Sequence, residues 1–128
     1  MLLIKTSVRK TNSIPGEDQY GIFTSEYVSK GQIIWDYQNV ITVREETFRF
    51  LQEHKLVEYT EKYGTVDEFG VWTVDSDNTK YMNHADKPNV LFIDNIGIAL
   101  KDIDLNQELF CDYRKITSQK HFLKLMGI

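Results

Sequence analysis

The sequence predicts one β-rich α+β domain over residues 1–128, and three observations lead to this prediction. The length of 128 residues is about that of a single domain. The front half consists of short apolar and β-branched runs separated by turn residues. Residues 44–63 contain no Pro or Gly and repeat apolar side chains at approximately helical spacing. We therefore expect many short strands around one or two helices.

The expected elements follow from these local patterns. Thr42 and Glu45 fit a capping box at the start of a helix over 44–63. This helix is predicted to break near His54 and Lys55. An amphipathic stretch predicts a C-terminal helix over 118–126. A hairpin is expected around residues 94–97, where Asn and Gly tolerate positive φ. The predicted strands are 2–9, 20–24, 32–37, 40–43, 70–74, 90–93, 98–100 and 108–111.

The composition restricts the class of protein. With 41% hydrophobic and 27% charged residues, the chain has ordinary globular usage. A net charge of -4 disfavours nonspecific binding to nucleic acid and suits a basic partner. Apolar runs such as residues 1–4 are far shorter than the about 18 residues that cross a membrane. We expect a soluble intracellular protein without membrane contact, cytoplasmic or, in a eukaryote, nuclear.

Several common kinds of site are disfavoured. Cys111 is the only cysteine, so an intramolecular disulfide and a cysteine-built zinc site are excluded. His54, His84 and His121 lie far apart without metal-ligand spacing, so no metal is expected. The glycines form neither a Rossmann turn nor a phosphate-binding loop, and no G-x-S-x-G or H-E-x-x-H motif occurs. Nucleotide-dependent enzymes and two common hydrolase classes are therefore not predicted.

Three stretches carry a more specific signal: QYGIFTSEYVSKG at 19–31, YMNHADKPN at 81–89 and ELFCDYR at 108–114. In this order they resemble the SET domain, the fold of most lysine methyltransferases that use S-adenosylmethionine. Each motif alone is weak, and their ordered occurrence carries the resemblance. Small single-domain bacterial and viral members are the most similar, because the chain has no flanking cysteine-rich zinc modules. The resemblance implies several small sheets and a C-terminal pseudoknot, in which the last segment passes through a loop.

The resemblance also implies a cofactor site. The backbone of Gln19, Tyr20 and Gly21 is expected to approach the methionine part of the cofactor, with Gly21 allowing a close path. The family usually has a second glycine where Gln19 stands. Asn83 and His84 match the pair that hydrogen-bonds the amino-acid and adenine portions.

Asp86 and Phe122 have further expected roles near the cofactor site, and Phe122 and His84 each keep an alternative. Asp86, after Ala85, is expected to cap the turn. Phe122 is a candidate to stack on adenine, although a C-terminal helix is more often simply docked on the core. The alternative for His84 is a satisfied core histidine in a structural turn.

Tyr113 matches the family's active-site tyrosine, and its hydroxyl would orient the lysine amine or the methyl group. Phe110 and one of Tyr37, Tyr59 or Tyr63 are expected to supply aromatic walls of a lysine channel. Cys111 stands where many members carry Phe or Tyr, so we expect room for more than one methyl group. The alternatives are a small apolar filler for Cys111 and a strand-end aromatic for Tyr113.

The sequence thus predicts methyl transfer from S-adenosylmethionine to the ε-amine of a lysine in a protein or peptide. Gly21, Asn83 and Tyr113 are expected to surround one common pocket. One alternative is a SET-fold module that binds cofactor or lysine peptide with little turnover, motivated by Gln19 and Ala85. A second is a structural or oligomerising β domain without cofactor. Exposed strand edges allow a homodimer.

Overall fold

The structure is a computed structural model that describes residues 1–16, 18–38, 40–54 and 57–128. The strands are β1 (Thr6–Lys10), β2 (Tyr20–Thr24), β3 (Ile33–Asp36), β4 (Val40–Val43), β5 (Thr65–Val66), β6 (Trp72–Asp75), β7 (Asn83–His84), β8 (Val90–Ile93), β9 (Ile96–Ala99) and β10 (Phe110–Cys111). The helices are α1 (Glu45–Glu53), α2 (Glu58–Tyr63) and α3 (Gln119–Leu125), with short 3-10 turns η1 (Asn78–Tyr81) and η2 (Tyr113–Lys115).

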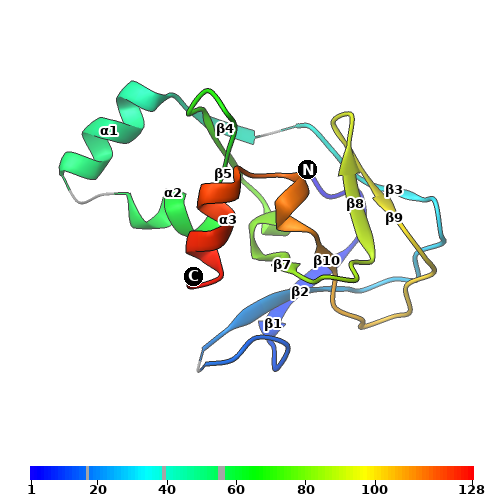
Figure 1. Cartoon of the computed structure of the whole chain (residues 1–128). Helices are drawn as coiled ribbons and strands as arrows, with labels where there is room; N and C mark the ends of the chain where they lie inside the picture. Colours follow the sequence, from blue (N-terminus) through cyan, green and yellow to red (C-terminus); the bar gives the residue numbers. More distant parts are fainter. Residues whose placement is uncertain (17, 39, 55–56) are drawn as a thin grey trace.

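Within the described residues the strands form four small sheets, as Figure 1 shows. β1 pairs with β2, β3 pairs with β9 and β9 with β8, and β6 lies between β4 and β5, all antiparallel. β7 and β10 form the one parallel pair among them. This arrangement confirms the prediction of a β-rich α+β fold of several small sheets.

The N-terminal strand is shorter than predicted. It begins at Thr6 rather than Leu2, and it extends one residue further, to Lys10. The first residues follow β3 instead: Leu2 bridges Trp35, and the Leu3 amide donates to the Ile34 carbonyl at 2.8 Å. The apolar run over 2–9 therefore serves two different sheets, and periodicity alone does not reveal that division.

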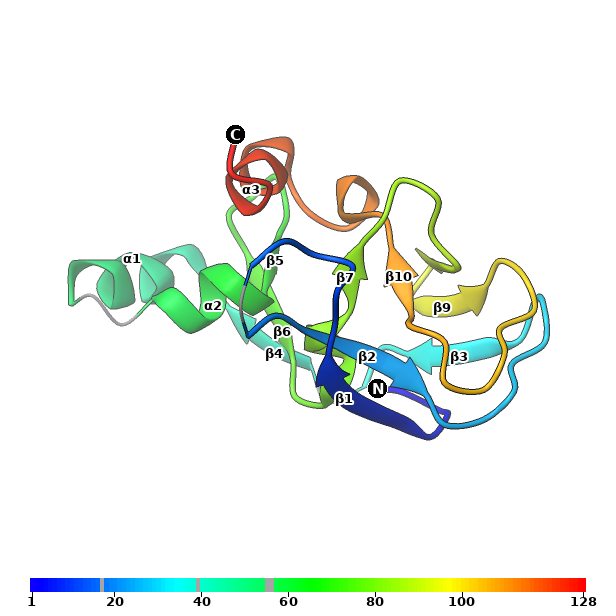
Figure 2. The same cartoon turned by 90° about the horizontal axis from the view of Figure 1, so that it is seen from below.

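The predicted helix over 44–63 is two helices. α1 ends at the C-cap His54, and Lys55 lies outside the described residues. The capping-box prediction is wrong, because Thr42 lies in β4 opposite Thr73 and the N-cap is Arg44, without a side-chain cap bond. In Figures 1 and 2, α1 lies at the outer edge of the molecule. Phe48 attaches it by stacking on Trp72 at 4.6 Å between ring centroids.

The β8–β9 hairpin turns at Asp94 and Asn95, which have φ of 51° and 65°. The predicted turn over 94–97 was two residues too long, since two residues with positive φ close a tight hairpin. Gly97 lies inside β9, where a Cβ would come 2.9 Å from the Cβ of Trp35. Gly97 is therefore needed for close packing against β3 and not for the turn.

The core gathers between β2, β3, β9 and the segment before β10. Ile22, Ile34, Ile103 and Leu109 are each at most 1% exposed, and Cys111 belongs to the same cluster. Ile22 also binds Leu109 through its backbone carbonyl, at 2.8 Å. Two of the three sequence motifs are thus connected through the core.

No helix within the described residues is long and apolar enough to cross a membrane.

Candidate active site

The parallel pair of β7 and β10 brings the Asn-His motif beside the last strand. Asn83 lies opposite Phe110, and His84 lies opposite Cys111. Asn89, which is 7% exposed, binds this strand with both ends of its amide: Nδ2 donates to the Glu108 carbonyl at 2.9 Å, and Oδ1 accepts from the Phe110 amide at 2.7 Å. The polar residues of 81–89 therefore pair two segments that are distant in sequence, as buried polar groups require.

Tyr113 follows β10 and is held from two sides. Its hydroxyl donates to the Met82 carbonyl at 2.7 Å, and its backbone amide donates to Nδ1 of His84 at 3.0 Å. Burial raises the pKa of the Tyr113 hydroxyl above its ordinary value. The hydroxyl is therefore protonated at neutral pH and has a fixed direction.

Both ring nitrogens of His84 have partners within the chain. Because Nδ1 accepts a hydrogen bond from the Tyr113 amide, the ring hydrogen is placed on Nε2, which donates to Asp86 Oδ1 at 3.1 Å. Asp86 was expected to cap the turn, but its carboxylate faces His84 and lies 3.6 Å from the Arg114 guanidinium. The Phe122 ring of α3 lies 5.2 Å from the His84 ring, edge to face. His84 is thus a satisfied histidine, and its ring nitrogens are occupied within the chain.

Gly21 and Asn83 meet at the side chain of Glu108. Nδ2 of Asn83 donates to the Tyr20 carbonyl at 2.9 Å and to Oε2 of Glu108 at 3.1 Å. A Cβ at Gly21 would lie 2.5 Å from that same Oε2 and 3.2 Å from the Asn83 amide nitrogen. The glycine was expected to make room for a cofactor, but the space that it leaves is filled by Glu108.

Gln19 and Tyr20 lie at the start of β2. The Gln19 carbonyl accepts from the Thr11 amide at 2.9 Å, across the loop that joins β1 and β2. The Tyr20 side chain is 44% exposed, and its carbonyl is taken by Asn83. These backbone groups therefore bind other parts of the chain.

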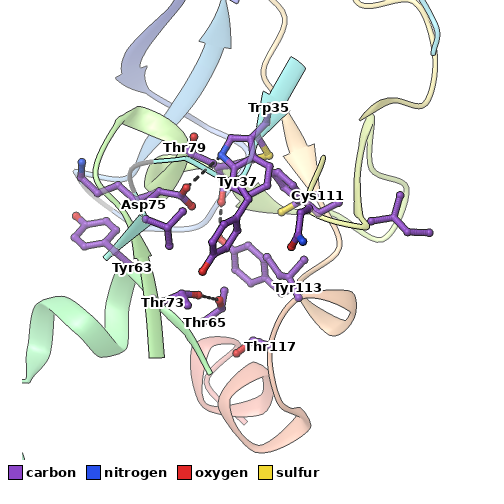
Figure 3. Close-up of a pocket in the computed structure, with 18 of the residues that line it drawn as sticks. Trp35, Tyr37, Tyr63, Thr65, Thr73, Asp75, Thr79, Cys111, Tyr113 and Thr117 are labelled. Carbon is purple, nitrogen blue, oxygen red and sulfur yellow. Dashed lines mark hydrogen bonds between the residues drawn. The ribbon is translucent and has the colours of Figure 1, made fainter. Parts of the chain in front are cut away.

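A cavity of about 280 Å³, with Met82 among its lining residues, lies beside Tyr113 (Figure 3). Tyr113 and Cys111 line it, together with Tyr37 and Tyr63 of the three tyrosines proposed as walls. Tyr59 does not line it and is exposed. Its other aromatic walls are Trp35 and Phe92. The cavity is therefore aromatic on several sides, with Tyr113 in its wall, and Lys62, Asp75 and Lys80 also line it. We call it the aromatic chamber.

Phe110, which was predicted to line a lysine channel, is not among the residues that line this cavity. Successive side chains of a strand point to opposite faces, so Phe110 and Cys111 cannot both face the cavity. Cys111 faces it, and burial raises the pKa of its thiol to about 12. The thiol is therefore inert and serves as a small apolar wall.

The expected common pocket is not formed as predicted. Tyr113 and Met82 line the cavity, whereas Gly21 and Asn83 do not. All three motifs nevertheless belong to one hydrogen-bonded network, because Asn83 directly follows Met82, whose carbonyl holds Tyr113. The backbone around Met82 thus separates the aromatic chamber from the polar cluster at Gly21.

Asp75 is a cavity residue that sequence reasoning missed. It ends β6, and its Oδ1 accepts from Nε1 of Trp35 at 3.2 Å. Burial raises the pKa of its carboxyl. The signal in the sequence was an acidic residue at the end of an apolar strand, which is common on protein surfaces and therefore uninformative alone.

Asp75→Asn is expected to raise the free energy of unfolding at pH 7. An acid whose pKa is raised on folding favours the folded state at low pH, and that contribution is lost as the pH rises through the folded pKa. Asparagine keeps the acceptor for Trp35 and removes the buried charge. The gain over wild type should shrink as the pH falls through the raised folded pKa and should be largely gone below the ordinary Asp pKa of 3.8. Denaturant unfolding at pH 7 and pH 3, with the exposed Asp104→Asn as control, measures it. An equal difference at both pH values would contradict the assignment.

No group of three His, Cys, Asp or Glu side chains that could hold a metal ion occurs in the part of the chain that the structure describes.

The chain belongs to the SET domain family, whose family model matches residues 19–114. None of the curated protein sequences compared with this chain matches it.

Solved structures are similar in fold. A chain of ctPRC2, the polycomb repressive complex 2 of Chaetomium thermophilum, in an autoinhibited conformation bound to S-adenosylmethionine, has a TM-score of 0.67 at 20% identity over 97% of this chain. The match spans 17% of that chain. A putative histone methyltransferase of Plasmodium falciparum has a TM-score of 0.54 at 22% identity, covering 85% of this chain and 96% of that one. At these identities the similarity concerns the fold.

Proposed function

We propose that this chain transfers a methyl group from S-adenosylmethionine to the ε-amine of a lysine in a protein or peptide. The observation that carries the proposal is the Tyr113 hydroxyl, which is protonated, directed by Met82 and placed at an aromatic cavity. Tyr113 lies within the family match. Similarity to a chain bound to S-adenosylmethionine and to a putative histone methyltransferase supports the same activity.

The polar cluster around Asn83 fits the amino-acid end of the cofactor. Both amide protons of Asn83 are donated within the chain, and no described residue donates to its Oδ1. This oxygen is an acceptor that suits an ammonium group. The rings of His84 and Phe122, 5.2 Å apart, are the aromatic candidates for contact with adenine. Asn83, His84 and Phe122 would therefore hold the cofactor.

Bound S-adenosylmethionine would supply a methyl group carried on a positively charged sulfur, and that sulfur would leave as a neutral thioether as the lysine nitrogen bonds to the methyl carbon. The chain's part is to admit the lysine and to hold it. Free lysine has a pKa near 10.4, and loss of contact with water disfavours its charged form, so entry into the cavity would favour the neutral amine. Tyr113 orients this amine through its hydroxyl and does not act as a base, since its pKa is raised. Alignment of this kind can contribute roughly 7–11 kcal/mol.

Two measurements test the proposal. Calorimetric titration with S-adenosylmethionine is expected to show saturable binding, and labelled methyl transfer to proteins of a cell extract is expected to mark lysines. Binding without transfer would favour the alternative of a binding module. Absence of both would leave a structural domain.

Cys111→Phe is expected to restrict the product to monomethyl-lysine, whereas wild type and Cys111→Ala add more than one methyl group. Cys111 lines the cavity beside Tyr113, and a phenyl ring would fill the space that a methylated amine needs to turn. Mass spectrometry of the product at full conversion measures the outcome. A wild-type product that stops at one methyl group would contradict this role.

Other features remain predictions from the sequence. They are a single SET domain over residues 1–128, the threading of the C-terminal segment as a pseudoknot, homodimer formation and an intracellular location. The parallel pairing of β7 with β10 supports the pseudoknot, because it requires the last segment to lie beside the Asn-His motif. Size-exclusion chromatography with light scattering tests the dimer.

A further inference from the structure

Glu108 gathers more side-chain contacts than any role assigned so far explains. Its Oε2 accepts from Nδ2 of Asn83 at 3.1 Å. Its Oε1 accepts from the Thr11 hydroxyl, and the Ser13 hydroxyl lies 3.0 Å and 3.3 Å from the two oxygens. The carboxylate therefore has partners in two segments that are distant from it in sequence.

The backbone around Glu108 is fixed independently of these contacts. Glu108 forms a bridge with Phe23, and the next amide, that of Leu109, donates to the Ile22 carbonyl at 2.8 Å. Leu109 itself is fully buried in the core. The side chain thus projects from a rigid position over Gly21, where the absence of a Cβ leaves it room.

These contacts determine which atom of Asn83 is presented to a ligand. One amide proton goes to the Tyr20 carbonyl and the other to Glu108, so the amide nitrogen is fully used and Oδ1 remains as acceptor. Without the Glu108 carboxylate, one Nδ2 proton of Asn83 would lose its acceptor, and the side-chain amide would be free to rotate so that its nitrogen and oxygen exchange places. The hydroxyls of Thr11 and Ser13 would lose their shared acceptor at the same time.

We propose that Glu108 is a positioning residue for the cofactor site. Glu108 holds the Asn83 amide so that the amide oxygen faces the ammonium of the cofactor. Through its hydrogen bonds to Thr11 and Ser13, Glu108 also fixes the loop that carries them next to the same site, and we call this contact the latch. The first of these roles rests on the proposed function, and the second does not.

The test uses Glu108→Ala and Glu108→Gln, with Glu68→Gln at an exposed acid as the matched control. Removing a hydrogen bond to a charged group is expected to weaken S-adenosylmethionine binding roughly tenfold or more in the alanine variant. Glutamine keeps one acceptor oxygen, so Glu108→Gln should lose less affinity for S-adenosylmethionine than Glu108→Ala. The Michaelis constant for the cofactor should rise with kcat nearly unchanged at saturation, which a general loss of structure would not produce.

Two further readouts separate the roles. The loss of affinity in Glu108→Ala should largely disappear for an S-adenosylmethionine analogue that lacks the α-amino group. The Asn83 oxygen then has no ammonium from which to accept a hydrogen bond. Amides near Thr11 and Ser13 should exchange with solvent faster in both Glu108 variants, without any ligand, and as in wild type in the control. Circular dichroism checks that each variant is folded.

The outcomes are distinguishable. Wild-type affinity in a folded Glu108→Ala, or an equal loss for the analogue, overturns the role toward the cofactor. Unchanged amide exchange near Thr11 overturns the latch. Absence of cofactor binding by the wild-type chain overturns the proposed function and the Asn83 role together, while the exchange result still decides the latch.

Discussion

Tyr113→Phe is expected to lower kcat for methyl transfer by about 10²-fold, since loss of alignment by about 1 Å costs this much. The substitution removes only the hydroxyl that binds the Met82 carbonyl at 2.7 Å, so the aromatic wall of the cavity is kept. Affinity for S-adenosylmethionine should stay near wild type, because Asn83 and Glu108 are unchanged. Labelled methyl transfer and calorimetric titration measure the two effects separately.

Tyr59→Phe is the matched control for this prediction. It removes the hydroxyl of an exposed tyrosine that does not line the cavity, so kcat and the affinity for S-adenosylmethionine should both stay unchanged. Near-wild-type kcat in Tyr113→Phe would remove the hydroxyl from the mechanism.

Gly21→Ala is expected to lower both the free energy of unfolding and the affinity for S-adenosylmethionine. The new methyl group would lie 2.5 Å from Oε2 of Glu108 and 3.2 Å from the Asn83 amide nitrogen, so both side chains must move. Overpacking of this kind costs about 1–3 kcal/mol. Gly21 does not have a positive φ, so the cost comes from the contact and not from the backbone. Denaturant unfolding and calorimetric titration measure the two losses.

Gly31→Ala provides the comparison. Gly31 has φ of 85° with no atom near its Cβ position, so alanine there strains the backbone far from the site. It should lose stability and keep cofactor affinity. Adding Glu108→Ala to Gly21→Ala should recover part of the lost stability, because the two side chains compete for one space. Additive losses would show that the clash is relieved in another way.

Local patterns predicted the elements that depend on neighbouring residues. β2 and β4 match their predicted bounds, and α3 lies within 118–126 because Ser118 caps it through the His121 amide. The helix break near His54 was also anticipated. The capping box at Thr42 failed because pairing with β6 overrode the local preference. The bounds of these elements were therefore predictable from local residues, whereas the N-cap of α1 depended on the pairing of β4 with β6.

At the site, the sequence motifs identified residues but not the directions or partners of their side chains. The ordered motifs identified Asn83, His84, Cys111 and Tyr113, and the structure brings all four to the junction of β7 and β10. Their direction was not predictable: Phe110 faces away from the cavity because of strand alternation about a register that is set by β7. Glu108 was within a quoted motif, but its partners Thr11 and Ser13 lie near the other end of the chain.

By itself, the sequence determined the class of fold, the family and the identity of the central tyrosine, because these depend on residue types in order along the chain. Only the tertiary structure decided that Glu108 occupies the space beside Gly21, that Asn83 presents its oxygen, and that Asp75 lines the cavity. The physical reason is that hydrogen-bond partners and burial depend on contacts between distant segments, which local residue patterns do not encode.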